Sequence, residues 1–246
     1  MKNMRQTIVF LLLLSACTVP MFAQEGEFTI GQGMGGINFM LTFPQGEFKE
    51  TSDRVGYGLG LEGAYVLPGM PLAAGFAGTF ATYGSRTFNV PFSGTVQLVN
   101  VDLTTSNNIA TGHVFLRLQP QDGVFRPYFE GLLGLHVFWT ESTVEDQRYE
   151  DSEIAGSTNL SDVAFSYGGG GGIMYLLHRG ETEIPGEGIE ILLDLKVRFL
   201  YGGEAEYFGE DSITFDANGV PVLRRENAMK STTDMLQTMI GLTVRF

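Results

Sequence analysis

The strongest constraint on this fold is the alternation of side chains in the last residues of the chain. From Thr238 onward the sequence reads TMIGLTVRF, and Ile240, Leu242, Val244 and Phe246 share one parity. A period of two predicts a β-strand with one apolar and one polar face. Because a terminal apolar strand has little to pack on in water, this strand is better suited to lipid, with Phe246 at the headgroup boundary.

Seven further segments show the same alternation between turn-forming residues. Together with the closing strand they predict an all-β fold, an eight-stranded antiparallel up-and-down transmembrane β-barrel. After residue 23 no apolar run reaches the roughly 18 residues of a membrane helix, so a chain that spans a membrane must close into a barrel. The predicted strands cover residues 26–43, 55–67, 72–84, 109–118, 125–140, 163–178, 189–201 and 233–246.

The connections between these strands alternate in length, as they do in outer-membrane barrels. Short connections are 68–71, 119–124 and 179–188, and long ones are 44–54, 85–108, 141–162 and 202–232. Two long connections are expected to contain hairpins, over 87–103 and around Asn218-Gly219 in 212–223. The acidic connection 141–162 is expected to be mobile. Aromatic residues at both strand ends predict two interfacial girdles, namely Tyr65, Phe129, Tyr175 and Phe246, and Tyr57, Phe80, Trp139 and Tyr201.

The N-terminal residues have the pattern of a signal for export. Lys2 and Arg5 precede an apolar stretch, and Ala23 ends a segment suited to cleavage. We therefore assign 1–23 to a signal peptide and 24–246 to the barrel domain. The alternative is lipidation at Cys17, which ends a lipoprotein-like box. Because Cys17 is the only cysteine, cleavage after residue 23 excludes disulfides and thiol catalysis.

Composition excludes several classes of protein. The formal net charge is −13, which argues against nucleic-acid binding because phosphates are repelled. The chain has 33 Gly, which favours strands with close backbone approach over long helices. A soluble lipocalin-like barrel is the alternative within the fold class, but its reversed faces would bury about a dozen large aromatic residues in a small lumen.

The polar parity of the strands places charged side chains inside the barrel. Four acids and four bases balance there, which predicts a salt-bridged plug, with a selectivity constriction of a narrow pore as the alternative. The expected interior polar network is Glu62, His113, Arg117, Glu130, His136, Glu190, Asp194, Lys196, Arg198 and Arg245.

The histidines raise the question of enzymatic activity. His113 and His136 face inward on neighbouring predicted strands, whereas His178 lies at the short-turn rim. Hydrolysis would need a serine beside them, and no serine is well placed on an adjacent inward position. We expect both to belong to the polar plug, and we expect no catalytic residues, no cofactor and no metal site. The glycine run from Gly168 to Gly172 is expected to leave room inside the barrel.

The closing strand and the alternating connections resemble small eight-stranded outer-membrane barrels of the OmpA/OmpX kind, over residues 26–246. The resemblance implies a Gram-negative outer membrane, contact with its lipid, a monomer, and recognition of Phe246 as an insertion signal by the barrel assembly machinery. Without a peptidoglycan-binding domain after the barrel, a cell-wall tether is not expected. The resemblance favours a structural or surface-interaction (adhesion-type) role, in which an extracellular partner binds at 85–108 and 202–232. A porin-like narrow pore and a lipid-modifying enzyme are the alternatives.

Overall fold

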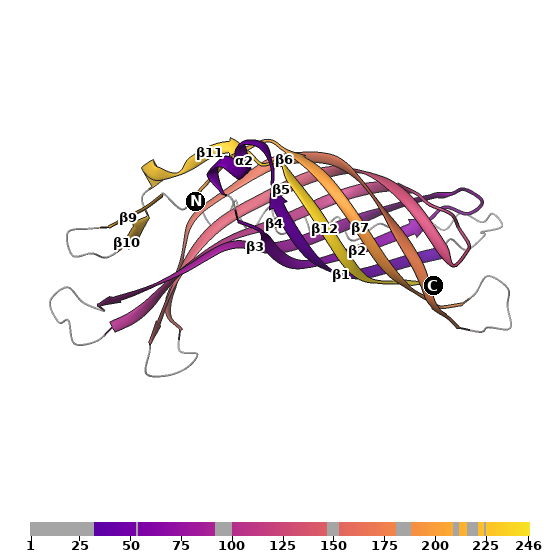
Figure 1. Ribbon diagram of the computed structural model, residues 1–246, viewed down its shortest axis with the longest axis horizontal. Helices are drawn as coiled ribbons and strands as arrows, with labels where there is room; N and C mark the ends of the chain where they lie inside the picture. Colours follow the sequence, from indigo (N-terminus) through magenta and orange to yellow (C-terminus); the bar gives the residue numbers. More distant parts are fainter. Residues whose placement is uncertain are drawn as a thin grey trace, which may run out of the picture. The chain divides into compact units, whose positions relative to one another are not determined.

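Eight long strands close into a single antiparallel barrel (Figure 1). The computed structural model describes residues 32–52, 54–91, 100–146, 153–180, 188–208, 212–215, 221–223 and 225–246. The barrel strands are β1 (Gln32–Pro44), β2 (Gly56–Val66), β3 (Leu72–Pro91), β4 (Asn100–Leu118), β5 (Phe125–Asp146), β6 (Glu153–Arg179), β7 (Glu190–Gly202) and β12 (Met235–Arg245). Each strand pairs with its neighbour along the chain, and β12 closes on β1. The predicted barrel is confirmed, while the predicted signal peptide lies outside the described residues.

The outer wall of the barrel is apolar. Leu61, Leu116 and Phe165 are 63%, 58% and 54% exposed, whereas inward neighbours such as Arg117 and Ser166 are at most 1% exposed. A lipocalin-like arrangement requires the opposite, so that alternative is wrong. Among the described residues, no helix combines the length and the apolar content needed to cross a membrane.

Exposed aromatic side chains lie near both ends of the outer wall. Tyr65, Phe129, Tyr175 and Phe246 are near the ends of strands that meet the short turns, and each is at least 47% exposed. Tyr57, Phe80 and Tyr201 lie toward the long connections and are also exposed. At Phe246 the backbone N–H and C=O both pair with Gly33, which extends the seam between β1 and β12. The outer wall thus has an apolar band between two aromatic borders.

Four neighbouring strands continue beyond the other four at the long-loop end, toward the left of Figure 1. β2 pairs with β3 only as far as Thr82, but β3 and β4 stay paired to Pro91 and Asn100. The hairpin expected over 87–103 is therefore confirmed for its described strands, and its tip lies outside the described residues. We call residues 84–91, 100–107, 141–146 and 153–160 the projecting sheet.

The connection expected over 141–162 is shorter than predicted, because residues 141–146 and 153–162 belong to strands and residues 147–152 lie outside the described part of the chain. β5 runs to Asp146 and β6 begins at Glu153, and the two strands pair through Glu145 and Glu153. Acidic residues are poor strand formers, but this preference depends strongly on context. Here the backbone pairing of β4 with β5 holds the strand in place.

Short elements gather between β7 and β12 and after β1. They are α2 (Gly46–Thr51), β8 (Glu204–Tyr207), β9 (Ile213–Phe215), β10 (Pro221–Leu223), η2 (Arg225–Asn227) and β11 (Met229–Thr232). β9 and β10 form the hairpin expected in 212–223, and its Asn218-Gly219 turn lies outside the described residues. The sequence did not predict α2 or the pairing of β8 with β11.

Candidate functional site: the barrel interior

The interior of the barrel is built in layers, and β5 crosses each of them. From the short-turn end to the long-loop end its inward side chains include Arg126, Tyr128, Glu130, His136 and Phe138, each at most 6% exposed. They mark, in order, a charged rim, an ion-pair network, a histidine layer and an aromatic cap. Buried side chains therefore occupy the lumen along its length.

The central layer is an ion-pair network of three acids and three bases, Glu62, Arg117, Glu130, Asp194, Lys196 and Arg198. Arg117 lies 2.8 Å from Glu130 and 3.1 Å from Glu62. Arg198 contacts the same two carboxylates, at 2.6 Å from Glu130 and 3.0 Å from Glu62. Their side chains are at most 5% exposed. Two guanidinium groups and two carboxylates thus join β2, β4, β5 and β7 across the lumen.

Lys196 and Tyr128 extend this network toward the short-turn end. The ammonium group lies 2.7 Å from Glu62 and 2.8 Å from Asp194. The Tyr128 hydroxyl donates to the other Asp194 oxygen at 2.7 Å, and the Arg117 guanidinium lies 4.2 Å from the Tyr128 ring centroid. Every charge of the network therefore has an opposite partner, as a buried ionic cluster requires.

Glycines on intervening strands allow these side chains to meet. Glu130, Gly170 and Arg198 occupy one register row across β5, β6 and β7. A Cβ atom on Gly170 would lie 2.9 Å from Arg198 Cγ and 2.6 Å from the Val197 carbonyl oxygen. Gly172 has the same relation to Tyr128, at 2.6 Å from its hydroxyl oxygen. The glycine run therefore leaves room inside the barrel, as expected.

Gly170→Ala is expected to lower the free energy of unfolding by about 1–3 kcal/mol, because a methyl group would displace Arg198 or the β7 backbone. Gly169→Ala is the matched control, since its Cβ atom would point outward and come no closer than 3.4 Å to the Glu130 carbonyl oxygen. The control should stay within about 0.5 kcal/mol of the parent. Urea unfolding in lipid vesicles measures both, and equal losses would contradict the role given to Gly170.

The histidine layer contains a serine that the sequence did not indicate. Ser166 Oγ lies 3.1 Å from His113 Nε2, so the expectation that no serine is well placed is wrong. His113, Gly134 and Ser166 share one register row, and the missing side chain of Gly134 allows the contact. The sequence showed the inward parity of Ser166, but not a contact across an intervening strand. His136 Nδ1 lies 3.4 Å from Thr233 Oγ1, and the two imidazole rings are 5.6 Å apart.

The charged rim lies at the short-turn end, apart from the central network. Glu190 is bound by Arg126 at 2.8 Å, by Arg179 at 2.6 Å and more loosely by Arg245 at 3.7 Å. Arg245 also donates to the Gln121 carbonyl oxygen. The predicted interior polar network is therefore not one cluster, because Glu190 and Arg245 belong to the charged rim and not to the central network. Arg126 and Arg179 were not predicted from the sequence as members of this rim. Arg126 could have been found, because it has the same parity as the inward Tyr128.

An aromatic cap closes the long-loop end. Phe48 of α2 is 1% exposed and packs edge-on against Tyr83, Phe138 and Tyr207, with ring centroids 5.6, 5.7 and 5.2 Å away. Phe138 and Tyr207 stack on each other at 5.9 Å. This cap joins α2 and β8 to the barrel wall. Its signal in the sequence is one phenylalanine in the polar connection 44–54, which does not specify the partners of this ring.

Polar contacts tie the elements of the cap together. The Tyr207 hydroxyl contacts Thr51 Oγ1 and lies 2.6 Å from Ser231 Oγ. Glu47 accepts from the backbone N–H and the hydroxyl of Thr232. Burial raises the pKa of the Tyr207 phenol, which keeps the hydroxyl protonated. α2, β8 and β11 therefore form one small unit over the lumen.

The contact between Ser166 and His113 lies deep inside the barrel. Ser166 and His113 are 0% and 2% exposed, beneath the cap and above the ion pairs. A reaction needs a path for substrate to its nucleophile and base. His178, by contrast, is exposed near the short-turn end of β6. In the part of the chain that the structure describes, no group of three or more His, Cys, Asp or Glu side chains is arranged to hold a metal ion.

Comparison with known proteins identifies structural likeness without sequence relatives. No family model matches the chain, and no curated protein matches it. Among solved structures, Ail of Yersinia pestis, in complex with the heparin analogue sucrose octasulfate, is 16% identical with a TM-score of 0.39, covering 88% of this chain and 99% of that chain. OprG of Pseudomonas aeruginosa is 17% identical with a TM-score of 0.41, covering 88% and 96%.

A major outer membrane protein of Thermus thermophilus is 13% identical with a TM-score of 0.44, covering 87% of this chain and 99% of that chain. At such identities the likeness concerns the fold alone. The sequence-based resemblance to small outer-membrane barrels holds at that level, since the chain itself forms a closed eight-stranded barrel.

Proposed function

We propose that this chain is an integral barrel of the bacterial outer membrane with a closed lumen and a surface-interaction role carried by the projecting sheet. The apolar outer wall supports the membrane location, because an exposed apolar band between aromatic borders is stable in lipid and unstable in water. In this proposal β12 with Phe246 is the segment that the barrel assembly machinery reads, and the protein acts as a monomer.

One observation carries the surface role, namely that four strands stay paired well past the point where the other four end. β3 pairs with β4 over eight positions beyond Thr82, from Gly84 to Pro91. A strand needs only about 9–11 residues to span the bilayer, so this sheet stands outside it. A rigid sheet beyond the membrane is a suitable platform for a partner.

The charge of the projecting sheet indicates the chemistry of that partner. Its one basic residue is Arg86, and its acids are Asp102, Glu141, Glu145, Asp146 and Glu153, a net charge of 1 − 5 = −4. We propose that it favours a basic partner or one bridged by divalent cations. At physiological salt the Debye length is about 8 Å, so such binding should weaken as salt rises.

Neither alternative function has a specific observation in its favour. A pore requires water through the level where Arg117 and Arg198 bind Glu62 and Glu130, and these side chains are buried and mutually paired. An enzyme requires access to Ser166 and His113, which are also buried. We therefore propose a non-enzymatic and non-conducting barrel.

Shortening both hairpins of the projecting sheet should remove binding and leave the barrel intact. Replacing residues 87–104 by Asn-Gly joins Arg86 to Thr105, which are register partners, so the turn fits a two-residue hairpin. This replacement removes Asp102, but the other four acids lie on β5 and β6. Residues 141–159 are therefore also replaced by Asn-Gly, which joins the register partners Thr140 and Leu160. Cells that express this doubly shortened variant, which lacks all five acids, should lose most of their low-salt adhesion to a polylysine surface. Its folded form should still migrate differently from its boiled form on a gel.

The matched control shortens the β9–β10 hairpin in the same way. Replacing residues 214–222 by Asn-Gly joins Ile213 to Leu223 and leaves the projecting sheet unchanged. Adhesion should stay near the parent value. Full adhesion of the doubly shortened variant would contradict the proposal, as would loss of folding in that variant alone.

A further inference from the structure

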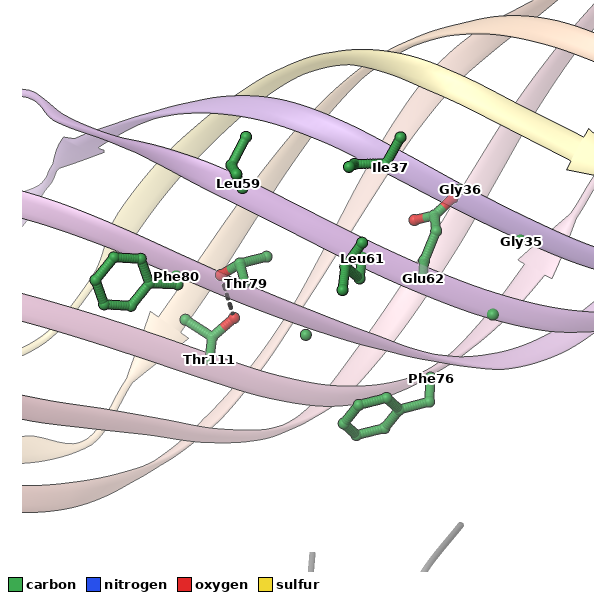
Figure 2. A pocket seen from close by; sticks show the side chains of 12 residues that line it. Gly35, Gly36, Ile37, Leu59, Leu61, Glu62, Phe76, Thr79, Phe80 and Thr111 are labelled. Carbon is green, nitrogen blue, oxygen red and sulfur yellow. Dashed lines mark hydrogen bonds between the residues drawn. The ribbon is translucent and has the colours of Figure 1, made fainter. Parts of the chain in front are cut away.

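A groove crosses the outer wall over β1, β2 and β3. It has a volume of about 790 Å³ and is lined by twelve residues. Figure 2 shows the apolar side chains that border it, Ile37, Leu59, Leu61, Phe76 and Phe80, which are 46–63% exposed. The polar residues that line it, Glu62, Thr79 and Thr111, bond within the lumen, where the Thr79 and Thr111 hydroxyls are 2.8 Å apart.

Glycines lower the floor of this groove to the level of the backbone. Gly35 and Gly63 are register partners on β1 and β2, and Gly78 lies opposite Leu61 on β3. Three outward positions on adjacent strands therefore carry no side chain, while their neighbours rise around them. The groove therefore has a floor of backbone between apolar walls.

The fold does not require these three glycines. A Cβ atom on Gly35 would meet nothing within 4 Å, one on Gly63 only the Met34 carbonyl oxygen at 3.9 Å, and one on Gly78 nothing nearer than 3.6 Å. By contrast, the inward Gly170 would meet backbone at 2.6 Å. Glycine weakens a strand and often marks a place where a ligand approaches the backbone closely. These three glycines lie together inside the groove, and the space above them is open to an occupant from outside the chain.

We propose that the groove binds an acyl chain of a membrane lipid. This inference rests on the proposed membrane location and deepens it. The groove is continuous with the lipid-facing wall and lies between the border at Tyr65 and the border at Phe80. Its rims are hydrocarbon and aromatic side chains, and its polar residues direct their side chains into the lumen. A flexible hydrocarbon chain matches both this chemistry and a floor at backbone level.

The dimensions favour a lipid chain over a second copy of the protein. A standard protein interface takes about 20–30 residues a side, whereas twelve residues line this groove. Its volume falls in the range of about 300–1,000 Å³ that is typical of sites for small molecules. These dimensions therefore suit one acyl chain better than the surface of a second barrel, which would bridge the groove.

The test is photo-crosslinking in vesicles made with a phospholipid that carries a diazirine in one acyl chain. Labelled peptides should place several-fold more lipid on Phe76, which is 48% exposed, than on Leu195, which is 46% exposed on the outer face of β7. Leu61, which is 63% exposed, should exceed Leu195 by more than the ratio of their exposures. Even labelling of these three positions would overturn the proposal. A protein that does not enter the vesicles, with no heat-shifted band, would instead overturn the proposed membrane location.

Filling the groove supplies the second arm of the experiment. Gly63→Leu should reduce labelling of Leu61 and Phe76 to the level of Leu195. Gly131→Leu is the matched control, because Gly131 also faces outward with nothing within 4 Å of its Cβ position and lies outside the groove. Unchanged labelling in Gly63→Leu would contradict the proposal. Crosslinks between two copies at the groove, lost in Gly63→Leu, would identify a second barrel as the occupant and overturn it as well.

Discussion

Replacing Arg198 by Ala is expected to lower the free energy of unfolding of the barrel by about 3–5 kcal/mol. The guanidinium contacts Glu130 at 2.6 Å and Glu62 at 3.0 Å, and its side chain is 2% exposed. Its removal leaves three acids and two bases in the central network. The remaining excess negative charge is buried, since these side chains are at most 5% exposed. Removing one partner of a buried ion pair therefore destabilises a protein more than the intact pair stabilises it.

Two further variants distinguish the effect on stability of removing a buried charge from the effect of removing any arginine. Arg179 also lies 2.6 Å from a glutamate, but its side chain is 54% exposed, so Arg179→Ala should change stability by less than about 1 kcal/mol. Adding Glu130→Gln to Arg198→Ala restores the charge balance and should recover part of the loss. Urea unfolding in vesicles provides the comparison. Equal effects of the two Arg→Ala substitutions would show that the central network does not hold the barrel together.

Phe48→Ala is expected to open the aromatic cap without unfolding the barrel. Truncation of a fully packed phenylalanine costs about 3–5 kcal/mol, and Phe48 packs on three aromatic rings. The loss is local, because Phe48 belongs to α2, which lies outside the barrel strands. Amide hydrogen exchange of 46–51, 204–207 and 229–232 should accelerate about 100-fold or more, at about 1.4 kcal/mol for each factor of ten.

Phe129→Ala is the control for this substitution, because Phe129 is the same residue type and 73% exposed on the outer wall. It should leave exchange in the cap unchanged. Exchange in the central part of β5 should stay slow in both variants. Unchanged protection of the cap in Phe48→Ala would show that the cap does not depend on this ring, and collapse of the whole barrel would show that the cap is not a separate unit.

The barrel fold could be predicted from the sequence because its signal is local. Each membrane strand must alternate between lipid and lumen, so residues such as those from Glu190 to Tyr201 reveal their own orientation. The strand order could be predicted because strands joined by short turns pair with each other, which places sequence neighbours side by side in the barrel. The inward parity of Glu62, Arg117 and Glu130 was visible for the same reason.

The pairing of interior side chains could not be predicted to the same extent. Parity shows that Arg198 faces inward, but its contact with Glu130 crosses β6 above Gly170. The contact between His113 and Ser166 across Gly134 has the same origin. An inward glycine between two inward polar residues on flanking strands is a signal that could have located both contacts, once the register was known.

The elements that were missed depend on tertiary contacts. α2 has only six residues, too few for a helix to be stable alone, and it forms where Phe48 enters the cap. The strands around Asp146 and Glu153 contain acids that argue for a loop, and pairing with neighbouring strands overrides that preference. In each case the decisive partner is distant in sequence.

The measurement that tests the central claim most directly is the conductance of the purified wild-type protein in planar lipid bilayers. Insertion is first verified by the difference in migration between folded and boiled protein recovered from vesicles of the same lipid. Because the central network and the cap both fill the lumen, the inserted protein should show no stable channel over the background of the bilayer. Large and stable open channels from the inserted wild type would contradict the closed lumen and establish the protein as a pore.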